Sequence, residues 1–330
     1  MVISPMAGGP TTVELVLAAA DAGVVGTLAA GYKTAQAMQD EIAAVKAHEV
    51  AFGVNVFVPG KPTEDPPALH AFISSLEPDA VALGATLGQP AWDDDDFAAK
   101  VSVLIAEVPP FVTFTFGCPD PDVVRRLQDK GSIVGITVTT ADEAMVAAAV
   151  GADFLCLQGA EAGAHRGSFV NDDRADRDVP LHVLVPTVRA LTDLPLIAAG
   201  GISTAEEVRG CLASGAAMVQ LGTAFLRSTE SGANPTYKSA LADPSFTETA
   251  ITRAFSGRRA RSLVNQMMRD HGDAPMAYPE INNATRPLRA TATQQGDTNH
   301  MSLYAGEGFR RAEARPVGEI VEQLTAGIES

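Results

Sequence analysis

Residues 196–223 read LIAAGGISTAEEVRGCLASGAAMVQLGT. Two short apolar runs, at 196–199 and 218–221, are each followed by glycine, and a helical pattern lies between them. A helix that joins two buried strands brings them side by side in parallel, so this order of elements is typical of a parallel sheet. The stretch therefore predicts an α/β protein.

The same alternation extends through the first two thirds of the chain. The apolar runs give eight expected strands, at 2–4, 24–28, 52–57, 111–116, 133–138, 154–157, 196–199 and 218–221. Most are followed by a helical pattern, and several are almost continuously apolar, as strands buried on both faces are. Eight such units favour a (β/α)8 TIM barrel with an added helical lobe, and an open doubly wound sheet is the alternative.

Three parts of the chain are expected to fold differently. Residues 1–224 form the barrel, within which 60–107 read as a mainly helical excursion. Four aspartates at 93–96 precede an apolar run and indicate a solvated helix start. From 225 to 311 the strand–helix rhythm stops, and helices with loops should form a substrate or lid lobe over one barrel end. Residues 312–330 contain an amphipathic helix that should return to the barrel wall.

Composition excludes several classes of function. The chain has 330 residues, 46% of them hydrophobic and 19% charged, which is an ordinary globular balance. The net charge of −16 disfavours binding to nucleic acid and to anionic membranes, which both require a basic surface. Cys118, Cys156 and Cys211 have no metal-ligand spacing and their odd number disfavours a disulfide framework. With no signal peptide or apolar span in view, we expect a cytoplasmic protein and no metal site.

Two glycine loops predict a phosphate site. Gly200 and Gly201 follow one expected strand, and Gly222 and Thr223 follow the next. Glycine lets the backbone approach an anion closely, and the segment 203–206 reads as a capping box that would start a helix there. In TIM barrels the loops after the last two strands are the usual phosphate site. The alternative is that Gly200 and Gly201 only make a tight turn.

His165 is the strongest candidate for chemistry. It lies in the loop 158–167, QGAEAGAHRG, after the sixth expected strand. Glycines on both sides suggest a backbone folded around a ligand, and a neutral imidazole can accept a proton near pH 7. Asn55 and Gln158 end apolar strands, where their amides could cap the backbone or face the edge of a flavin ring. Cys156 and Cys118 are expected to be packing residues.

These motifs resemble the class I nitronate monooxygenases over nearly the whole chain. The residues that carry the resemblance are the segments 5–10, 53–57, 114–117, 158–167, 198–202, 220–225, 252–258 and 303–306. The resemblance implies a TIM barrel with a helical lobe and non-covalent FMN. It also implies oxidation of alkyl nitronates by O2 to a carbonyl compound and nitrite through a flavin semiquinone, with propionate 3-nitronate as the favoured substrate.

The resemblance also assigns residues. It makes His165 the active-site histidine, either as the base for a nitroalkane or as the residue that holds a nitronate, and it places Tyr304 in the substrate pocket, where many relatives have Trp. It places around FMN the residues Met6, Ala7, Gly8, Asn55, Gln158, Gly163, Gly200, Gly201, Gln220, Leu221, Gly222 and Thr223. The expected partners are a small nitronate, O2 and a further copy of the chain in a homo-oligomer.

Three alternatives stay open from the sequence. The same FMN barrel serves NAD(P)H-dependent reductases of quinones or enoyl thioesters. A flavin-binding protein without turnover, or a flavin-free barrel that acts on a phosphorylated metabolite, would carry some of the same loops.

Overall fold

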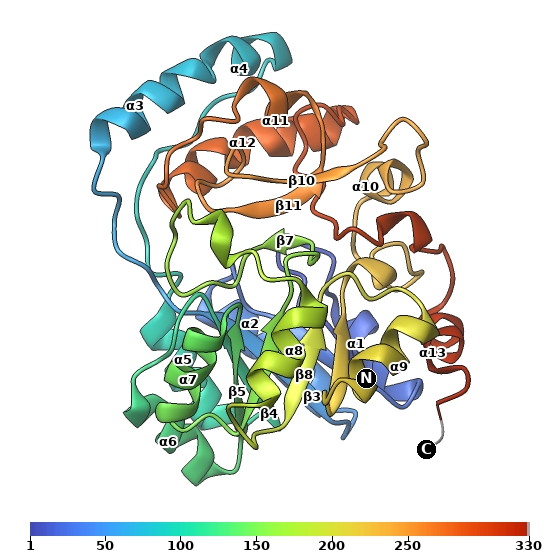
Figure 1. Cartoon of the computed structure of the whole chain (residues 1–330). Helices are drawn as coiled ribbons and strands as arrows, with labels where there is room; N and C mark the ends of the chain where they lie inside the picture. Colours follow the sequence, from blue (N-terminus) through green and yellow to red (C-terminus); the bar gives the residue numbers. More distant parts are fainter. Residues whose placement is uncertain (329–330) are drawn as a thin grey trace.

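A computed structural model describes residues 1–328 as a closed barrel with a lobe over one end (Figure 1). The barrel strands are parallel and follow one another in the order β1 (Val2–Ile3), β2 (Val25–Ala29), β3 (Phe52–Phe57), β4 (Phe111–Thr115), β5 (Ile133–Val138), β6 (Phe154–Gln158), β8 (Leu196–Ala199) and β9 (Met218–Leu221). Pairing of β1 with β9, in the register Val2 to Gln220, closes the barrel. The predicted (β/α)8 barrel is confirmed.

Helices between the strands form the outer layer. They are α1 (Val13–Asp21), α2 (Ala35–Lys46), α5 (Phe97–Glu107), α6 (Pro121–Lys130), α7 (Ala141–Ala149), α8 (Leu181–Arg189) and α9 (Ala205–Ala213), and α13 (Val317–Thr325) packs against α1 and α9. Four of them begin at a threonine whose hydroxyl accepts a backbone N–H of the first turn: Thr12, Thr34, Thr140 and Thr204. Such a cap satisfies an otherwise unpaired donor and fixes where the helix starts.

The capping box after β8 lies one residue later than the sequence indicated. Thr204 is the N-cap of α9, and its partner is Glu207, whose carboxylate accepts the Thr204 N–H at 3.0 Å. Glu206 is exposed and takes no part in the box. Glu207 also accepts the Ser203 N–H at 2.7 Å, so it fixes the loop between β8 and α9 as well as the helix start.

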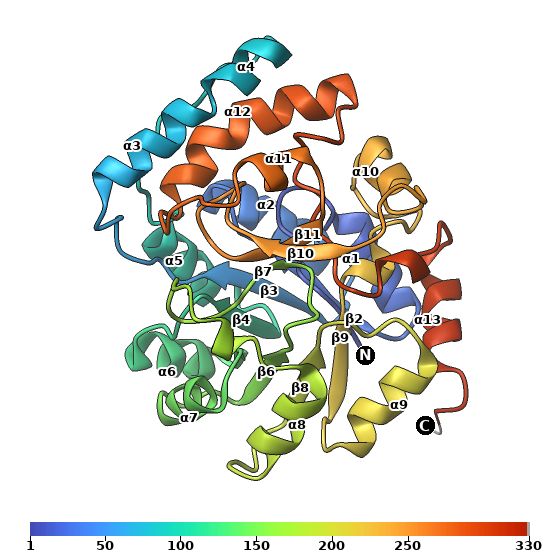
Figure 2. The ribbon, with the colours of Figure 1, turned by 45° about the horizontal axis from the view of Figure 1, so that its top comes forward.

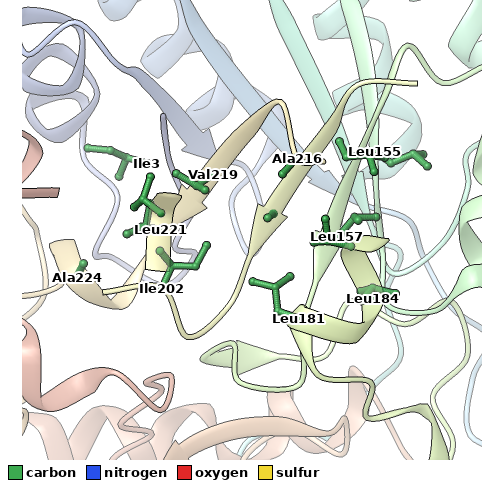
Figure 3. Packing of buried hydrophobic residues seen from close by; sticks show 14 of the residues in the cluster. Ile3, Leu155, Leu157, Leu181, Leu184, Ile202, Ala216, Val219, Leu221 and Ala224 are labelled. Carbon is green, nitrogen blue, oxygen red and sulfur yellow. The ribbon is translucent and has the colours of Figure 1, made fainter. Parts of the chain in front are cut away.

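Apolar side chains hold the strands and helices together. Leu155, Leu157, Val219 and Leu221 of the barrel strands pack with Leu184 of α8, and each is at most 2% exposed (Figure 3). Burial of a leucine or valine side chain stabilises a fold by about 1.5–3 kcal/mol. This packing makes the barrel a rigid base for the loops at the carboxyl ends of its strands.

The lobe contains a small sheet that the sequence did not predict. Strands β10 (Thr249–Thr252) and β11 (Ala260–Leu263) are antiparallel, and β11 pairs with β7 (Ala164–His165). The expectation of only helices and loops between 225 and 311 was therefore wrong. The helices there are α10 (Pro235–Ala240), α11 (Gln266–Asp270) and α12 (Glu280–Gln295). Because β7 includes His165, the predicted catalytic loop is an edge of the lobe sheet (Figure 1).

The segment 60–107 is helical and serves two parts of the molecule. α3 (Pro66–Ser75) and α4 (Glu77–Leu83) lie beside α12 in both views (Figures 1 and 2), and Leu69, Phe72 and Leu76 pack with Phe255 and Ile281 of the lobe. α5 instead packs against α2 and α6 of the barrel. The lobe is thus assembled from two separate stretches of sequence.

The aspartate run at 93–96 is not a simple solvated helix start. α5 begins after Asp96 without a side-chain cap. Asp95 turns inward, where its carboxylate lies 2.7 Å from the Nζ of Lys100 and accepts the backbone N–H of Tyr32 at 2.9 Å. Lys100 is fully buried. One aspartate of the four is therefore a structural ion-pair partner.

Three 3-10 turns, Ala175–Arg177, Thr223–Phe225 and Phe309–Arg311, complete the fold. All three cysteines are free, as expected, and burial raises the pKa of Cys156 to about 12. Within residues 1–328, no helix combines the length and the apolar character needed to cross a bilayer. Over the same residues, no His, Cys, Asp or Glu side chains are grouped so as to hold a metal ion.

Candidate active site

One cavity of about 670 Å³ collects every residue that the sequence placed at the site. It lies between the carboxyl ends of the barrel strands and the lobe. Its walls include His165, Tyr304, Met6, Ala7, Gly8, Asn55, Gln158, Gly163, Gly200, Gly201, Gln220, Leu221, Gly222 and Thr223. Their positions follow from the fold, since loops at the carboxyl ends of parallel strands meet at one face of a barrel.

The glycine loops form a cradle at one end of this cavity. Gly201 has a φ of +72°, and a Cβ there would lie 2.8 Å from the Cβ of Glu161, so only glycine fits without movement. Among the described residues, the backbone N–H groups of Gly201 and Thr223 have no protein acceptor. Free N–H groups beside the start of α9 suit a phosphate, and these residues fit the phosphate of a flavin nucleotide.

Polar side chains ring the floor of the cavity. Asn55 directs its Nδ2 to the Oγ1 atoms of Thr113 and Thr115, each at 2.9 Å. The Thr115 and Thr137 hydroxyls are 3.2 Å apart. With the Asn55 amide nitrogen occupied, its carbonyl oxygen and the threonine hydroxyls remain for the donors and acceptors of a flavin ring. The floor is compatible with that group.

Gln158 holds the His165 loop. Its Nε2 donates to the carbonyl oxygen of His165 at 3.0 Å, and its Oε1 accepts the Gly167 N–H at 2.8 Å and a guanidinium N–H of Arg166 at 3.0 Å. Arg166 is buried and pairs with Asp178. Both the nitrogen and the oxygen of the Gln158 amide therefore form hydrogen bonds within the protein. The main effect of Gln158 is on the conformation of the His165 loop.

Ser256 fixes the protonation of the His165 ring. The Ser256 Oγ lies 2.8 Å from His165 Nε2, 3.2 Å from the Arg258 carbonyl oxygen and 3.3 Å from the Arg258 N–H. A hydroxyl has one proton, and the buried Arg258 carbonyl has no other donor among the described residues. The hydroxyl therefore donates to that carbonyl and accepts from His165, which places the ring proton on Nε2 and leaves Nδ1 unprotonated.

Aromatic rings enclose His165. Its ring centroid is 5.2 Å from that of Tyr304, 5.5 Å from Tyr278 and 5.9 Å from Phe116. Burial, together with the nearby charges of Arg258 and Arg289, lowers the pKa of His165 to about 3. The ring is consequently neutral at physiological pH.

Two cations beside this ring have no acidic partner. Arg258 donates from Nε to the Arg166 carbonyl oxygen and lies 4.0 Å over the ring of Phe116. Arg289 donates to the Thr285 hydroxyl at 3.1 Å and to the side chain of Asn282 at 2.9 Å. Among the described residues neither guanidinium forms an ion pair. Arg289 lines the cavity and Arg258 is buried outside its lining, so both place unbalanced positive charge near His165 although the whole chain is acidic.

Sequence reasoning missed several residues of this site. Tyr32, Phe57 and Phe116 line the cavity, and Ser256 and Arg258 support its histidine. Ser256 and Arg258 lie in one of the segments that carried the family resemblance, which was the available signal. Nothing in the sequence singled out Tyr32 as a site residue except its position in a loop after an expected strand.

The comparisons with known proteins agree with this geometry. The family model described as nitronate monooxygenase matches residues 1–327. The chain belongs to the nitronate monooxygenase family. This membership confirms the resemblance found in the sequence, identifies the chain as an oxidoreductase and implies a flavin cofactor.

Individual relatives give the same result. A probable nitronate monooxygenase of Staphylococcus aureus strain MSSA476 is 34% identical over 324 residues, which are 96% of this chain and 90% of that protein. The crystal structure of nitroalkane oxidase from Streptomyces ansochromogenes aligns with a TM-score of 0.96 and 43% identity, covering 98% of this chain and 94% of that one. FabK from Thermotoga maritima aligns with a TM-score of 0.73 and 27% identity, covering 98% and 90%.

Proposed function

We propose that this member of the nitronate monooxygenase family uses FMN and O2 to oxidise alkyl nitronates to a carbonyl compound and nitrite. The observation that carries the proposal is the neutral His165 in a cavity whose wall includes Arg289, with Arg258 buried outside that wall; neither guanidinium has an acidic partner among the described residues. An unbalanced positive charge away from bulk water favours an anionic substrate. A nitronate is the anionic form of a nitroalkane.

The chain's own residues divide the work of binding. The N–H groups of Gly201 and Thr223 would hold the FMN phosphate, and Asn55 with the threonines of the floor would face the ring. When bound, the flavin supplies the electron acceptor for the substrate. Arg289 attracts the anion from the cavity wall, Arg258 adds positive charge from its buried position over the Phe116 ring, and the aromatic walls exclude water from the anion.

His165 has a limited role as a base. Its Nδ1 is free to take a proton, yet a pKa of about 3 is far from the value near 7 at which a general base works best. Removal of a proton from a neutral nitroalkane is therefore not the step that this site favours. A substrate that arrives already deprotonated needs only orientation by the fixed ring.

Arg286 would pair with a second negative charge on the substrate. Arg286 of α12 lines the outer part of the cavity and is exposed. Its guanidinium forms no hydrogen bond or ion pair with any described residue. This supports a carboxylated nitronate such as propionate 3-nitronate as the substrate.

The test is an anaerobic titration of the purified flavoprotein, followed by its visible absorbance. One sample receives ethyl nitronate, a second propionate 3-nitronate and a third NADH or NADPH. Loss of oxidised flavin with the nitronates, followed by nitrite release when O2 is admitted, is the expected result. Reduction by a nicotinamide without nitronate turnover would replace this function with that of a reductase.

A further inference from the structure

Tyr32 has a strained backbone at the wall of the cavity. It lies in the loop between β2 and α2 and has a φ of +66°, in the left-handed region. A non-glycine residue in this region has a strained backbone, and such strain is concentrated at functional sites. Its ring packs edge-on against Phe57, with centroids 5.6 Å apart.

A buried ion pair keeps Tyr32 in this conformation. The backbone N–H of Tyr32 donates to Asp95 at 2.9 Å, and the other oxygen of Asp95 lies 2.7 Å from the Nζ of Lys100. Lys100 is fully buried, and a buried ammonium is unfavourable unless it is paired. Asp95 and Lys100 lie outside the cavity lining, so their effect on the cavity is through Tyr32.

The hydroxyl of Tyr32 has a free proton. The Tyr278 hydroxyl donates to the Tyr32 oxygen at 3.1 Å, so Tyr32 is the acceptor in this pair and its own proton remains available. The hydroxyl oxygen of Tyr304 is buried. Ser256 is near enough to lower the pKa of this phenol, yet no group of the described residues meets the Tyr304 hydroxyl at hydrogen-bond geometry. An unpaired buried hydroxyl is costly, which indicates that a ligand completes it.

The two hydroxyls share one electrostatic environment. Burial raises the pKa of Tyr32, with a further contribution from Tyr304, and burial likewise raises the pKa of Tyr304. Arg289 lines the same cavity as Tyr32 and Tyr304, and its positive charge opposes the rise in pKa of both phenols. Both phenols are protonated at physiological pH and can donate hydrogen bonds next to a cation.

We propose that the hydroxyls of Tyr32 and Tyr304 bind the two oxygens of the substrate's nitronate group, which makes Tyr32 a substrate-binding residue held in place by Asp95 and Lys100. This rests on the proposed oxidation of nitronates. Two donors beside a guanidinium match a planar group that has two oxygens and one negative charge. The Tyr304 ring lies 5.2 Å from that of His165, which places the bound group beside the histidine.

The experiment compares the holoenzyme with Tyr32→Phe, Tyr304→Phe and the double variant. The set also includes Asp95→Asn. Its matched control is Asp94→Asn, because Asp94 is an exposed carboxylate of the same run whose side chain forms no hydrogen bond or ion pair with any described residue. Nitrate, a planar oxyanion that is not turned over, is titrated against the flavin absorbance to give a Kd. Ethyl nitronate gives kcat and KM. Flavin content and far-ultraviolet circular dichroism verify that each variant is folded.

Each single Tyr→Phe variant at 32 and 304 should raise the nitrate Kd and the nitronate KM by about tenfold, as loss of one hydrogen bond to an anion does. The Asp94→Asn control should change both by less than about twofold. Asp95→Asn, which loosens the Tyr32 loop, should raise the nitrate Kd as Tyr32→Phe does, while kcat changes little.

Unchanged nitrate Kd and nitronate KM in Tyr32→Phe would overturn the inference, as would a wild-type protein that binds no nitrate. The outcome is separable from that of the proposed function. A wild-type protein that binds nitrate through Tyr32 but oxidises no nitronate would refute the oxygenase activity and leave the oxyanion site standing.

Discussion

The Ser256 hydroxyl lies 2.8 Å from Nε2 of His165, although the two residues are 91 positions apart in the chain. His165 belongs to a loop of the barrel that pairs with the lobe sheet, and Ser256 belongs to the lobe. Through this contact, the position of the lobe affects the orientation of the His165 imidazole in the active site. It also determines which ring nitrogen is unprotonated, because the Ser256 proton is used by the Arg258 carbonyl.

Replacement of Ser256 by alanine should impair the enzyme without loss of flavin. The ring of His165 would lose its hydrogen bond to Ser256, and we expect kcat/KM for a nitronate to fall about tenfold, the effect of one lost positioning contact. Ser256→Thr keeps the hydroxyl and should retain most activity. The imidazole nitrogen shifts measured by NMR should show a proton on Nε2 in the wild-type protein and a mixture of tautomers in Ser256→Ala.

Replacement of His165 by asparagine should separate the two substrate forms. A neutral nitroalkane needs a base, and its turnover is already slow in the wild type because the pKa of His165 is about 3; without the imidazole it should fall by a further factor of about 100 or more. A nitronate needs only orientation, and its turnover should fall about tenfold. Stopped-flow rates with nitroethane and with its pre-formed nitronate measure both. Equal losses for the two substrates would show that His165 has the same function with each.

The pH dependence of stability should report the buried neutral state of His165. The unfolded chain binds a proton at this residue below about pH 6.5, while burial and two guanidiniums lower the folded-state pKa to about 3. Between these values the unfolded state holds more protons, so the free energy of unfolding falls as pH falls, by up to about 1.4 kcal/mol per pH unit. Urea unfolding of flavin-free protein should show a steeper fall in the free energy of unfolding for the wild type than for His165→Gln, because the carboxylates titrate in both proteins and the imidazole only in the wild type.

The phosphate cradle should be intolerant of a single methyl group. Gly201→Ala places a Cβ 2.8 Å from Glu161 Cβ at a φ of +72°, a strain of about 1–3 kcal/mol. If about 1.4 kcal/mol of that strain is present only in the FMN-bound state, the Kd for FMN rises about tenfold. Gly210→Ala in α9 is the control, because its Cβ would meet nothing within 4 Å. Fluorescence titration of FMN measures both, and equal affinities would contradict the cradle.

The lobe should depend on one carboxylate of α4. Asp79 lies 2.6 Å from Nε2 of the buried His271, and His300 Nε2 lies 3.7 Å from its other oxygen. Asp79→Ala leaves His271 without this partner, and we expect a loss of about 1–3 kcal/mol in stability. Thermal melting and limited proteolysis at 60–96 should detect it. The neighbouring exposed Glu77→Ala should melt like the wild type.

The sequence by itself determined the barrel and the set of loops at its working face. Strand runs such as 133–138, and glycine loops such as 200–201, are local patterns, and a barrel brings the ends of its strands to one face whatever the details. That is why Asn55, His165 and Gly201, chosen from sequence, line one cavity. The limit of local patterns is visible at the capping box, which lies one residue later than expected.

Tertiary structure decided what surrounds those loops. The pairing of β7 with β11, the assembly of the lobe from 60–96 and 225–311, and the contact of Ser256 with His165 all join residues far apart in sequence. The same holds for Asp95, which the sequence placed in solvent and the fold directs to Tyr32. Such contacts have no local periodicity or spacing, because they form only when packing brings separate segments to hydrogen-bonding distance.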